Sequence, residues 1–233
     1  MEHLYDTHFH LDLQKNLSAA IREIEEHQIY TIAVTNLPDL YRKESGETVS
    51  KYIRFALGFH PELVHQYKSQ IPLMWELLSD ACCIGEVGLD FVDVTHKNEQ
   101  LAFFSELIER CRYDSNKIIT IHSRKAVRQV LDIIGDNFRF KPILHWFTGS
   151  KEELLNAIEK GFYFSINKSM MNTKKFQSML ALIPKERLLF ETDSPFISSP
   201  YSHHETLAKI NQLIKENKED VNMWNNFKIV LGD

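Results

Sequence analysis

The sequence predicts an α/β protein folded as a (β/α)8 TIM barrel, either regular or distorted. Short apolar runs alternate along the chain with amphipathic segments of helical spacing, and such alternation implies a parallel sheet. Eight of these units fit within 233 residues, a length at which α/β barrels are undivided. Ionisable residues follow most of the runs, at the end of a barrel where active sites form. The alternative is an open doubly wound sheet, but no Gly-x-Gly-x-x-Gly motif follows the first run.

The strands are predicted from apolar runs that are rich in β-branched residues. In chain order they cover residues 3–8, 29–35, 52–58, 82–86, 117–121, 142–145, 162–165 and 187–191. The helices are predicted from apolar side chains spaced three and four residues apart. They cover residues 16–27, part of 38–50, 72–78, 96–113, 125–134, 151–160, 173–182, 204–215 and 219–231. Thr95 and Ser150 are the predicted N-caps of the helices that follow them.

Composition and charge are those of an ordinary globular protein, with 43% hydrophobic and 25% charged residues. The net charge of -5 excludes a basic field over the whole molecule, so a nucleic acid would be held by a local patch or by metal. Three cysteines without metal-site spacing indicate a reducing compartment. The sequence shows neither a signal segment at its start nor an apolar run of about 20 residues. We therefore expect a cytoplasmic protein in a single domain over residues 1–233, without membrane association.

Polar residues with metal-binding chemistry follow six of the predicted strands. His8 and His10 would share one face of the first strand, because alternate side chains of a strand point the same way. Two such imidazoles can hold one divalent ion. The candidates at the ends of the later strands are His60, Glu86, His122, Arg124, His145, Glu191 and Asp193.

Each of these residues also has a structural explanation when it is taken alone. His60 precedes a proline and could be a turn residue, and Glu86 could be an exposed loop carboxylate. His122 and His145 could be buried neutral imidazoles. Asp193 could cap a helix that has proline at its first position. The occurrence of all of them at matching strand ends favours a joint metal site.

Neutral imidazoles and ionised carboxylates suit Zn, Mn or Mg rather than a thiolate site. Six ligand candidates exceed what one zinc ion usually takes from a protein. Two ions about 3.5–4 Å apart, bridged by a carboxylate, fit the set better. Such a pair stabilises the attacking and leaving oxygens of phosphate-ester hydrolysis and lowers the pKa of bound water towards about 7.

The chain resembles the TatD family of metal-dependent deoxyribonucleases. The motifs that carry the resemblance run from residue 6 to residue 197 in the family's order, and they read DTHFHLD, GFHP, GEVGLDF, IHSR, HWFTGS and ETDSPFI. The resemblance implies a single TatD-like hydrolase domain with two or three divalent ions (Mg, Mn or Zn). It also implies hydrolysis of DNA phosphodiesters, as a 3′→5′ exonuclease acting on single strands or 3′ ends.

The resemblance also implies a role for each matching residue. Glu86 resembles the carboxylate that bridges two metals, and Asp193 the ligand that also orients or deprotonates the water. His60, the third residue counted as catalytic, would lie near the scissile phosphate or a third metal. Arg124 would contact a substrate phosphate, or it is a solvated residue of a helix turn, and Glu191 would orient a metal ligand. The implied metal ligands are His8, His10, Glu86, His122, His145 and Asp193.

The sequence departs from the family pattern around the substrate rim. Phe9 and Trp146 stand where the family often has cysteine, residues 198–204 replace a loop that usually carries arginine, and the segment between residues 37 and 52 is short. This leaves two alternatives to the nuclease: an amidohydrolase or phosphotriesterase-like enzyme for small substrates, or a partner-dependent subunit of a larger complex. Short TatD-like proteins occur in multi-gene anti-phage cassettes, so a defence role with protein partners is an expectation. The oligomeric state is left open.

A nucleic-acid substrate would need local contacts near the predicted site. The candidate phosphate contacts are Arg124, Lys125, Lys168, Lys174 and Lys175. The candidate base-stacking residues, each of which could equally belong to the core, are Phe59, Phe91, Trp146 and Phe147.

Overall fold

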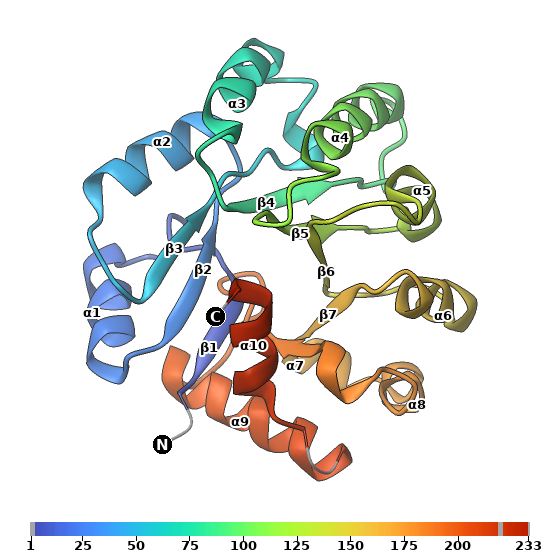
Figure 1. Ribbon diagram of the computed structural model, residues 1–233. Helices are drawn as coiled ribbons and strands as arrows, with labels where there is room; N and C mark the ends of the chain where they lie inside the picture. The colour runs from blue at the N-terminus through green and yellow to red at the C-terminus, as the bar shows by residue number, and fades with distance from the viewer. Residues whose placement is uncertain (1–2, 219–220, 233) are drawn as a thin grey trace.

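A computed structural model describes residues 3–218 and 221–232, and within them eight strands alternate with helices around a barrel (Figure 1). The strands are β1 (Tyr5–Phe9), β2 (Tyr30–Val34), β3 (Ile53–Ala56), β4 (Cys83–Gly88), β5 (Ile118–His122), β6 (Lys141–His145), β7 (Tyr163–Ile166) and β8 (Leu188–Phe190). The helices are α1 (Leu17–His27), α2 (Pro38–Glu47), α3 (Ile71–Leu78), α4 (Lys97–Cys111), α5 (Val127–Ile134), α6 (Lys151–Glu159), α7 (Lys168–Met171), α8 (Lys174–Leu180), α9 (His203–Asn217) and α10 (Met223–Leu231). Short 3-10 turns are η1 (Pro61–Leu63), η2 (Lys68–Gln70) and η3 (Lys185–Arg187). The predicted α/β barrel is confirmed.

The barrel is distorted, because its strand ladder is interrupted at two seams. Strands β1 to β3 form one parallel sheet and β4 to β8 a second. Between β3 and β4, Leu57 N donates to Cys83 O and Gly85 N donates to Leu57 O, both at 2.9 Å. Between β8 and β1, Asp193 N donates to His8 O at 3.0 Å. These bonds hold the two sheets together where the regular pairing stops.

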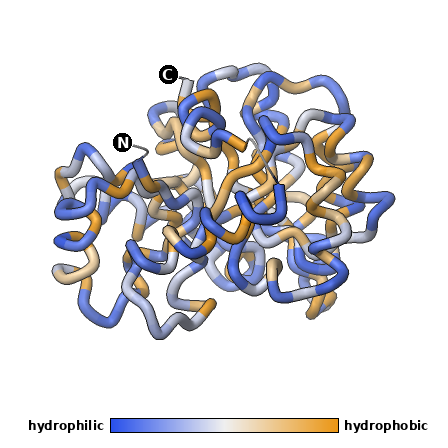
Figure 2. Tube along the Cα trace, turned by 90° about the horizontal axis from the view of Figure 1, so that it is seen from below, coloured by the Kyte–Doolittle hydropathy of each residue, from blue (hydrophilic) through white to orange (hydrophobic). Residues whose placement is uncertain are grey.

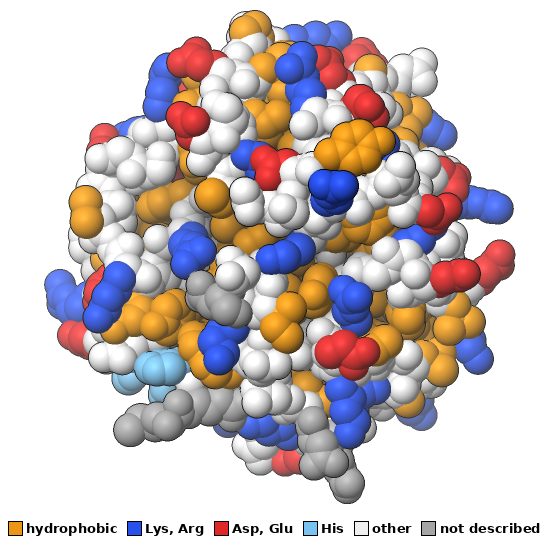
Figure 3. Space-filling view, viewed as in Figure 1, with side chains coloured by type: hydrophobic (Ala, Val, Ile, Leu, Met, Phe, Trp, Pro, Cys, Tyr) orange, Lys and Arg blue, Asp and Glu red, His pale blue; other side chains and the backbone are white. Residues whose placement is uncertain are grey.

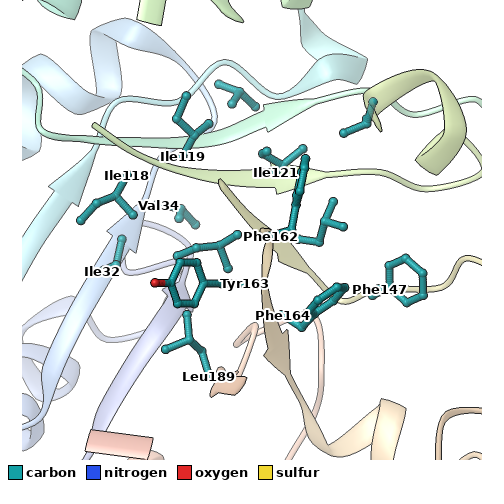
Figure 4. Close-up of a cluster of buried hydrophobic side chains, with 14 of the residues drawn as sticks. Ile32, Val34, Ile118, Ile119, Ile121, Phe147, Phe162, Tyr163, Phe164 and Leu189 are labelled. Carbon is teal, nitrogen blue, oxygen red and sulfur yellow. The ribbon is translucent and has the colours of Figure 1, made fainter. Parts of the chain in front are cut away.

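The core consists of alternating side chains on the two faces of the strands. Figure 4 shows Ile32 of β2, Tyr163 of β7 and Leu189 of β8 directed into the space that the strands enclose. Ala33, between two inward residues of β2, packs instead in an outer cluster with Ile24 of α1. Figure 2 shows the hydrophobic stretches concentrated in the middle of the molecule and hydrophilic segments around its outside.

Helix α10 closes the amino-terminal end of the barrel and lies in front in Figure 1. Asn226 Nδ2 donates to Lys185 O at 2.7 Å and to Leu188 O at 2.8 Å, just before and at the start of β8. Lys141 Nζ, at the start of β6, donates to Val230 O at 2.9 Å. On this side of the molecule, basic side chains are scattered among acidic and hydrophobic ones (Figure 3). The candidate site lies at the opposite end of the barrel, where the strands end.

The two predicted helix caps have different outcomes. Helix α4 begins after His96, whose side chain makes no capping hydrogen bond, so the prediction for Thr95 is wrong. Thr95 Oγ1 instead donates to Asp93 Oδ1 at 2.6 Å within the preceding loop. The prediction for Ser150 is confirmed, because its Oγ accepts from Glu153 N at 3.2 Å and the Glu153 carboxylate accepts from Ser150 N at 2.6 Å.

Two further differences concern short segments. Helix α7 was not predicted, because its four residues are too few to show a helical period. The last helix was predicted to begin at residue 219, but residues 219–220 lie outside the described part of the chain, and α10 begins at Met223. Among the residues that the structure describes, no helix combines the length and the apolar character needed to cross a membrane.

Candidate active site

The carboxyl ends of the strands surround a cavity of about 590 Å³, a size typical of ligand sites. Every strand that carries a predicted site residue contributes to it or to its floor. The predicted site residues that line the cavity are His10, His60, Glu86, His122, Arg124, His145 and Asp193. His8 lies directly beneath, fully buried. The structure therefore brings together all six residues predicted as metal ligands, from five different strands or strand ends.

Glu86 lies at the centre of this group, with histidines on both sides of its carboxylate. Its Oε2 lies 3.5 Å from His8 Nε2 and 3.4 Å from His10 Nε2. Its Oε1 lies 2.6 Å from His122 Nδ1 and 2.9 Å from His145 Nε2. The two oxygens of one side chain thus face two separate pairs of imidazoles.

Asp193 completes the side of the site that contains the first histidine pair. Its Oδ1 lies 3.5 Å from His10 Nε2 and 3.8 Å from His8 Nε2. The backbone bond from Asp193 N to His8 O, across the seam between β8 and β1, fixes this carboxylate beside the end of β1. The two histidines point the same way, as the alternation of side chains along a strand predicts.

Irregular pairing at two strands directs the central side chains. The register of β1 against β2 shifts between Asp6 and Phe9, on either side of His8. The register of β4 against β5 shifts between Ile84 and Val87, on either side of Glu86. Such irregularities re-aim a side chain relative to a regular strand.

The residue before Glu86 has to be glycine for the two strands to approach. Gly85 has φ 154°, and a Cβ there would lie 2.0 Å from Thr120 Cγ2 of β5. A larger residue would therefore have to displace the Thr120 side chain, whose Oγ1 contacts His8 Nδ1.

Two buried side chains lie within hydrogen-bond distance of a histidine ring nitrogen that faces away from Glu86, and a third, Glu191, lies near such a nitrogen without a hydrogen bond to it. Thr120 Oγ1 lies 3.0 Å from His8 Nδ1, and Asp90 Oδ2 lies 2.8 Å from His122 Nε2. Glu191 Oε1 lies 3.7 Å from His145 Nδ1 and accepts from Trp146 N at 3.1 Å and Asn167 Nδ2 at 2.9 Å. Such partners fix ring orientation in metal sites.

Sequence reasoning singled out Glu191 but missed the roles of Asp90 and Thr120. Asp90 belongs to the same GEVGLDF stretch as Glu86, so its place directly after β4 was an available signal. Thr120 lies two residues before His122 on β5, and its side chain therefore shares the face that carries the histidine.

The charges at the site depend on one another. Burial alone would raise the pKa of Glu86, but the charges of His60 and His145, with hydrogen bonds from His122 and His145, hold that pKa well below its ordinary value. Burial opposes the charged form of His145 as well, yet the carboxylates of Glu86 and Glu191 raise its pKa well above the usual range. At this place the electrostatics favour an anionic Glu86 beside positive charge.

The donor atoms fit divalent metal ions. His8 Nε2 and both ring nitrogens of His10 are buried and have no hydrogen-bond partner among the described residues, which is uncommon without a ligand. His8 Nε2 and His10 Nε2 lie 3.4 to 3.8 Å from the oxygens of Glu86 and Asp193. Two atoms that each lie about 2 Å from the same ion have this separation. Imidazole nitrogens with carboxylate oxygens are the donor set of Zn or Mn.

The remaining predicted residues lie at the rim. His60 Nε2 is 3.6 Å from Glu86 Oε1, while its Nδ1 accepts from Glu62 N at 3.3 Å, so this histidine forms the turn as well as facing the site. Arg124 lines the cavity, and its side chain makes no ion pair or hydrogen bond within the described ranges.

The predicted aromatic residues differ in exposure. Phe59, Phe91 and Phe147 are 0%, 8% and 2% exposed, so they belong to the core and their base-stacking alternative is wrong. Trp146 lines the cavity, as does Phe196, which the sequence analysis missed.

A distorted (β/α)8 barrel with clustered histidines and carboxylates at the carboxyl ends of its strands defines a metal-dependent hydrolase. The model of the family described as TatD related DNase matches residues 5–231. The chain belongs to this family and is therefore a metal-dependent hydrolase that acts on ester bonds.

Individual relatives agree with this assignment. The chain is 29% identical over 208 residues to the uncharacterized metal-dependent hydrolase YabD of Bacillus subtilis, covering 84% of this chain and 81% of the relative. It is 27% identical to the 3′-5′ ssDNA/RNA exonuclease TatD of Pantoea ananatis, covering 83% and 77% of the two chains. The crystal structure of YjjV, a TatD homologue from Escherichia coli K12, superposes with a TM-score of 0.77 at 19% identity over 99% of this chain and 98% of that one. This last likeness concerns the fold.

Proposed function

We propose that the protein hydrolyses phosphodiester bonds of DNA as a 3′→5′ exonuclease that acts on single strands or 3′ ends. The observation that carries the proposal is that the two carboxylate oxygens of Glu86 face different pairs of histidines. One oxygen faces His8 and His10, and the other faces His122 and His145. A carboxylate in this position suits two adjacent divalent ions. The relative from Pantoea ananatis, whose name is that of a single-strand exonuclease, supports the choice of substrate.

In this proposal each ion has its own set of ligands, and Glu86 is shared. His8, His10 and Asp193 would hold one ion, and His122 and His145 the other. The ions, Mg, Mn or Zn, would supply positive charge to the phosphate oxygens and make water a better nucleophile at neutral pH.

The other side chains would position the substrate and move protons. Asp193 Oδ1 faces His8 and His10, so its second oxygen is the proposed acceptor of a proton from the attacking water. Arg124 lines the cavity, where its guanidinium forms no ion pair or hydrogen bond with a described residue, and its planar fork matches two phosphate oxygens. His60, at the rim, would contact the phosphate on the side of Glu86 Oε1. Asp90, Thr120 and Glu191 would keep the imidazoles in place.

The test is hydrolysis of end-labelled single- and double-stranded DNA by metal-stripped protein to which Mg, Mn or Zn is returned. We expect cleavage that depends on metal and that Glu86→Ala abolishes. The matched control is Glu106→Ala, on the outer face of α4, where the side chain is 49% exposed; it should keep full activity. With a 5′ label, a 3′→5′ exonuclease gives a ladder that shortens stepwise from the 3′ end.

Other outcomes would contradict specific parts of the proposal. Shortening from the 5′ end would contradict the polarity. Turnover of a lactone or phosphotriester with DNA left intact would favour a small-substrate hydrolase. Activity only after addition of a co-purifying protein would favour the partner-dependent subunit, which is the form that a role in anti-phage defence would take.

A further inference from the structure

The mouth of the cavity carries an aromatic ring that is not part of the core. Phe196, three residues after Asp193, is 62% exposed and lines the cavity. Its ring meets that of His10 at 83° with 4.9 Å between centroids, so the contact uses the edge of one ring. Burying a phenylalanine side chain is favourable, yet Phe196 is largely exposed to solvent beside the candidate metal site.

Two ammonium groups lie against one tyrosine ring at the end of the barrel where the strands finish. Lys168 Nζ and Lys209 Nζ lie 5.8 Å and 4.2 Å from the centroid of the Tyr201 ring. Tyr201 and Phe196 both belong to the segment between β8 and α9, and Lys168 starts the helix after the neighbouring strand β7. Neither lysine forms an ion pair or a side-chain hydrogen bond within residues 3–218 and 221–232.

Among the described residues, no acidic side chain forms an ion pair with Lys168 or Lys209. The nearest acidic residue in the sequence, Glu205 in the first turn of α9, is engaged by the backbone N–H of Ser202 at 3.1 Å. In a chain with net charge -5, two unpaired lysines that are held against one tyrosine make a local positive site. An aromatic face next to unpaired positive charge is the combination that binds single-stranded nucleic acid without regard to sequence.

We propose that the segment from Phe196 to Lys209, together with Lys168, is the path along which a single nucleic-acid strand leaves the cavity. Phe196 stacks on the base of a nucleotide at the mouth. Lys168 and Lys209, held by Tyr201, bind phosphates of nucleotides farther along the strand. The inference rests on the proposed nucleic-acid substrate and adds where the strand lies and which residues hold it.

Binding measured without hydrolysis tests the path directly. The probes are a fluorescein-labelled single-stranded octathymidylate and an abasic octamer of the same length, titrated by anisotropy in EDTA at several salt concentrations. The double variant Lys168→Ala/Lys209→Ala should reduce the slope of log affinity against log salt by about 1.4, because each lost phosphate contact contributes about 0.7 for a single strand. The matched control is Lys51→Ala, whose ammonium lies 4.8 Å from the Tyr52 ring just before β3, at the opposite end of the barrel; its slope should stay that of the wild type.

Phe196→Ala tests the stacking part of the path. We expect this variant to bind octathymidylate roughly 5- to 100-fold more weakly than the wild type and to lose the preference for octathymidylate over the abasic octamer. Tyr113→Ala, at a ring that is 60% exposed before β5, is the matched control and should change neither quantity. If Phe196 only supported the local structure, Phe196→Ala would weaken the binding of both octamers equally.

The outcomes separate this inference from the proposed function. An unchanged salt slope in the lysine variant, or an unchanged preference for bases in Phe196→Ala, overturns the path even if the wild type cleaves DNA. The expected changes without cleavage under any metal support the path and contradict the proposed hydrolysis. A wild type that binds neither octamer overturns the path, and the cleavage assay with returned metal then decides the proposed hydrolysis on its own.

Discussion

Asp90 Oδ2 lies 2.8 Å from His122 Nε2 and thereby decides which nitrogen of His122 faces the centre of the site. The other nitrogen, Nδ1, lies 2.6 Å from Glu86 Oε1. Asp90 is itself fixed, because its Oδ1 accepts from Val92 N at 2.9 Å and its backbone N–H donates to Gln100 Oε1 at 2.8 Å. The loop after β4 is therefore part of the support of the candidate metal site.

Asp90→Asn should weaken this support while the fold is kept. An amide in place of the carboxylate loses the charge that favours an N–H at His122 Nε2, and we expect metal affinity or activity to fall about 10- to 100-fold. The measurement is a metal titration of activity together with circular dichroism. Asp93→Asn, at an exposed position of the same loop, is the matched control. A metal midpoint equal to that of the wild type would show that His122 keeps its orientation without Asp90.

Glu44 of α2 should make the protein less stable at alkaline than at acidic pH. Burial, followed by the charge of Asp12, raises the pKa of Glu44 from 4.5 to about 7, and its Oε2 has no hydrogen-bond partner among the described residues. The folded protein thus binds this proton more tightly than the unfolded chain does. The stability that the protonated form contributes is fully present below about pH 4.5 and is lost as the pH rises through about 7.

Glu44→Gln removes this dependence. We expect the variant to gain about 1 kcal/mol of unfolding free energy relative to the wild type between pH 4.5 and pH 8, a figure reduced for the partial exposure of the side chain. Urea denaturation at the two pH values measures it. Glu26→Gln, at an exposed position of α1, serves as the control. A difference between Glu44→Gln and the wild type that does not change with pH would contradict the raised pKa.

Lys117, which precedes β5, should matter for stability and not for catalysis. Its side chain is 7% exposed, and Nζ donates to Leu78 O at 2.7 Å, Ser79 O at 3.1 Å and Ala81 O at 2.8 Å. Lys117→Met would leave these carbonyls at the end of α3 without their donor, at a cost of about 2–4 kcal/mol of unfolding free energy. We expect kcat to stay unchanged below the melting transition, as in the control Lys51→Met, at an exposed position. A loss of kcat in the folded variant would link this end of the barrel to the site.

The grouping of the site residues was predictable because a parallel barrel brings all its carboxyl strand ends to one face. His10, Glu86 and Asp193 could be assigned to that face once the apolar runs before them were identified as strands. Their exact partners were not predictable, since the contact of Glu86 with both histidine pairs depends on the register shift in β4 and on the close approach at Gly85. No pattern along the chain reports such a shift.

Other features depend on neighbours that are distant in sequence. Thr120 could be taken as one more β-branched strand residue, and only the closure of the barrel, which brings side chains of β5 and β1 together across its interior, places it against His8. The exposure of Phe196 follows from the course of the loop after β8, whereas Phe147, equally aromatic and also after a strand, is buried. The interruptions between β3 and β4 and between β8 and β1 likewise arise from the closure of the barrel, which the periodicity of single strands does not describe.

The central claim is that Glu86 is shared between two metal ions. The most direct measurement is the number and place of bound ions in crystals of the wild type grown with Mn or Zn, located by anomalous scattering and compared with elemental analysis in solution. We expect two ions per chain, one against His8, His10 and Asp193 and one against His122 and His145, with an oxygen of Glu86 on each. A single ion, or two ions neither of which contacts Glu86, would contradict it.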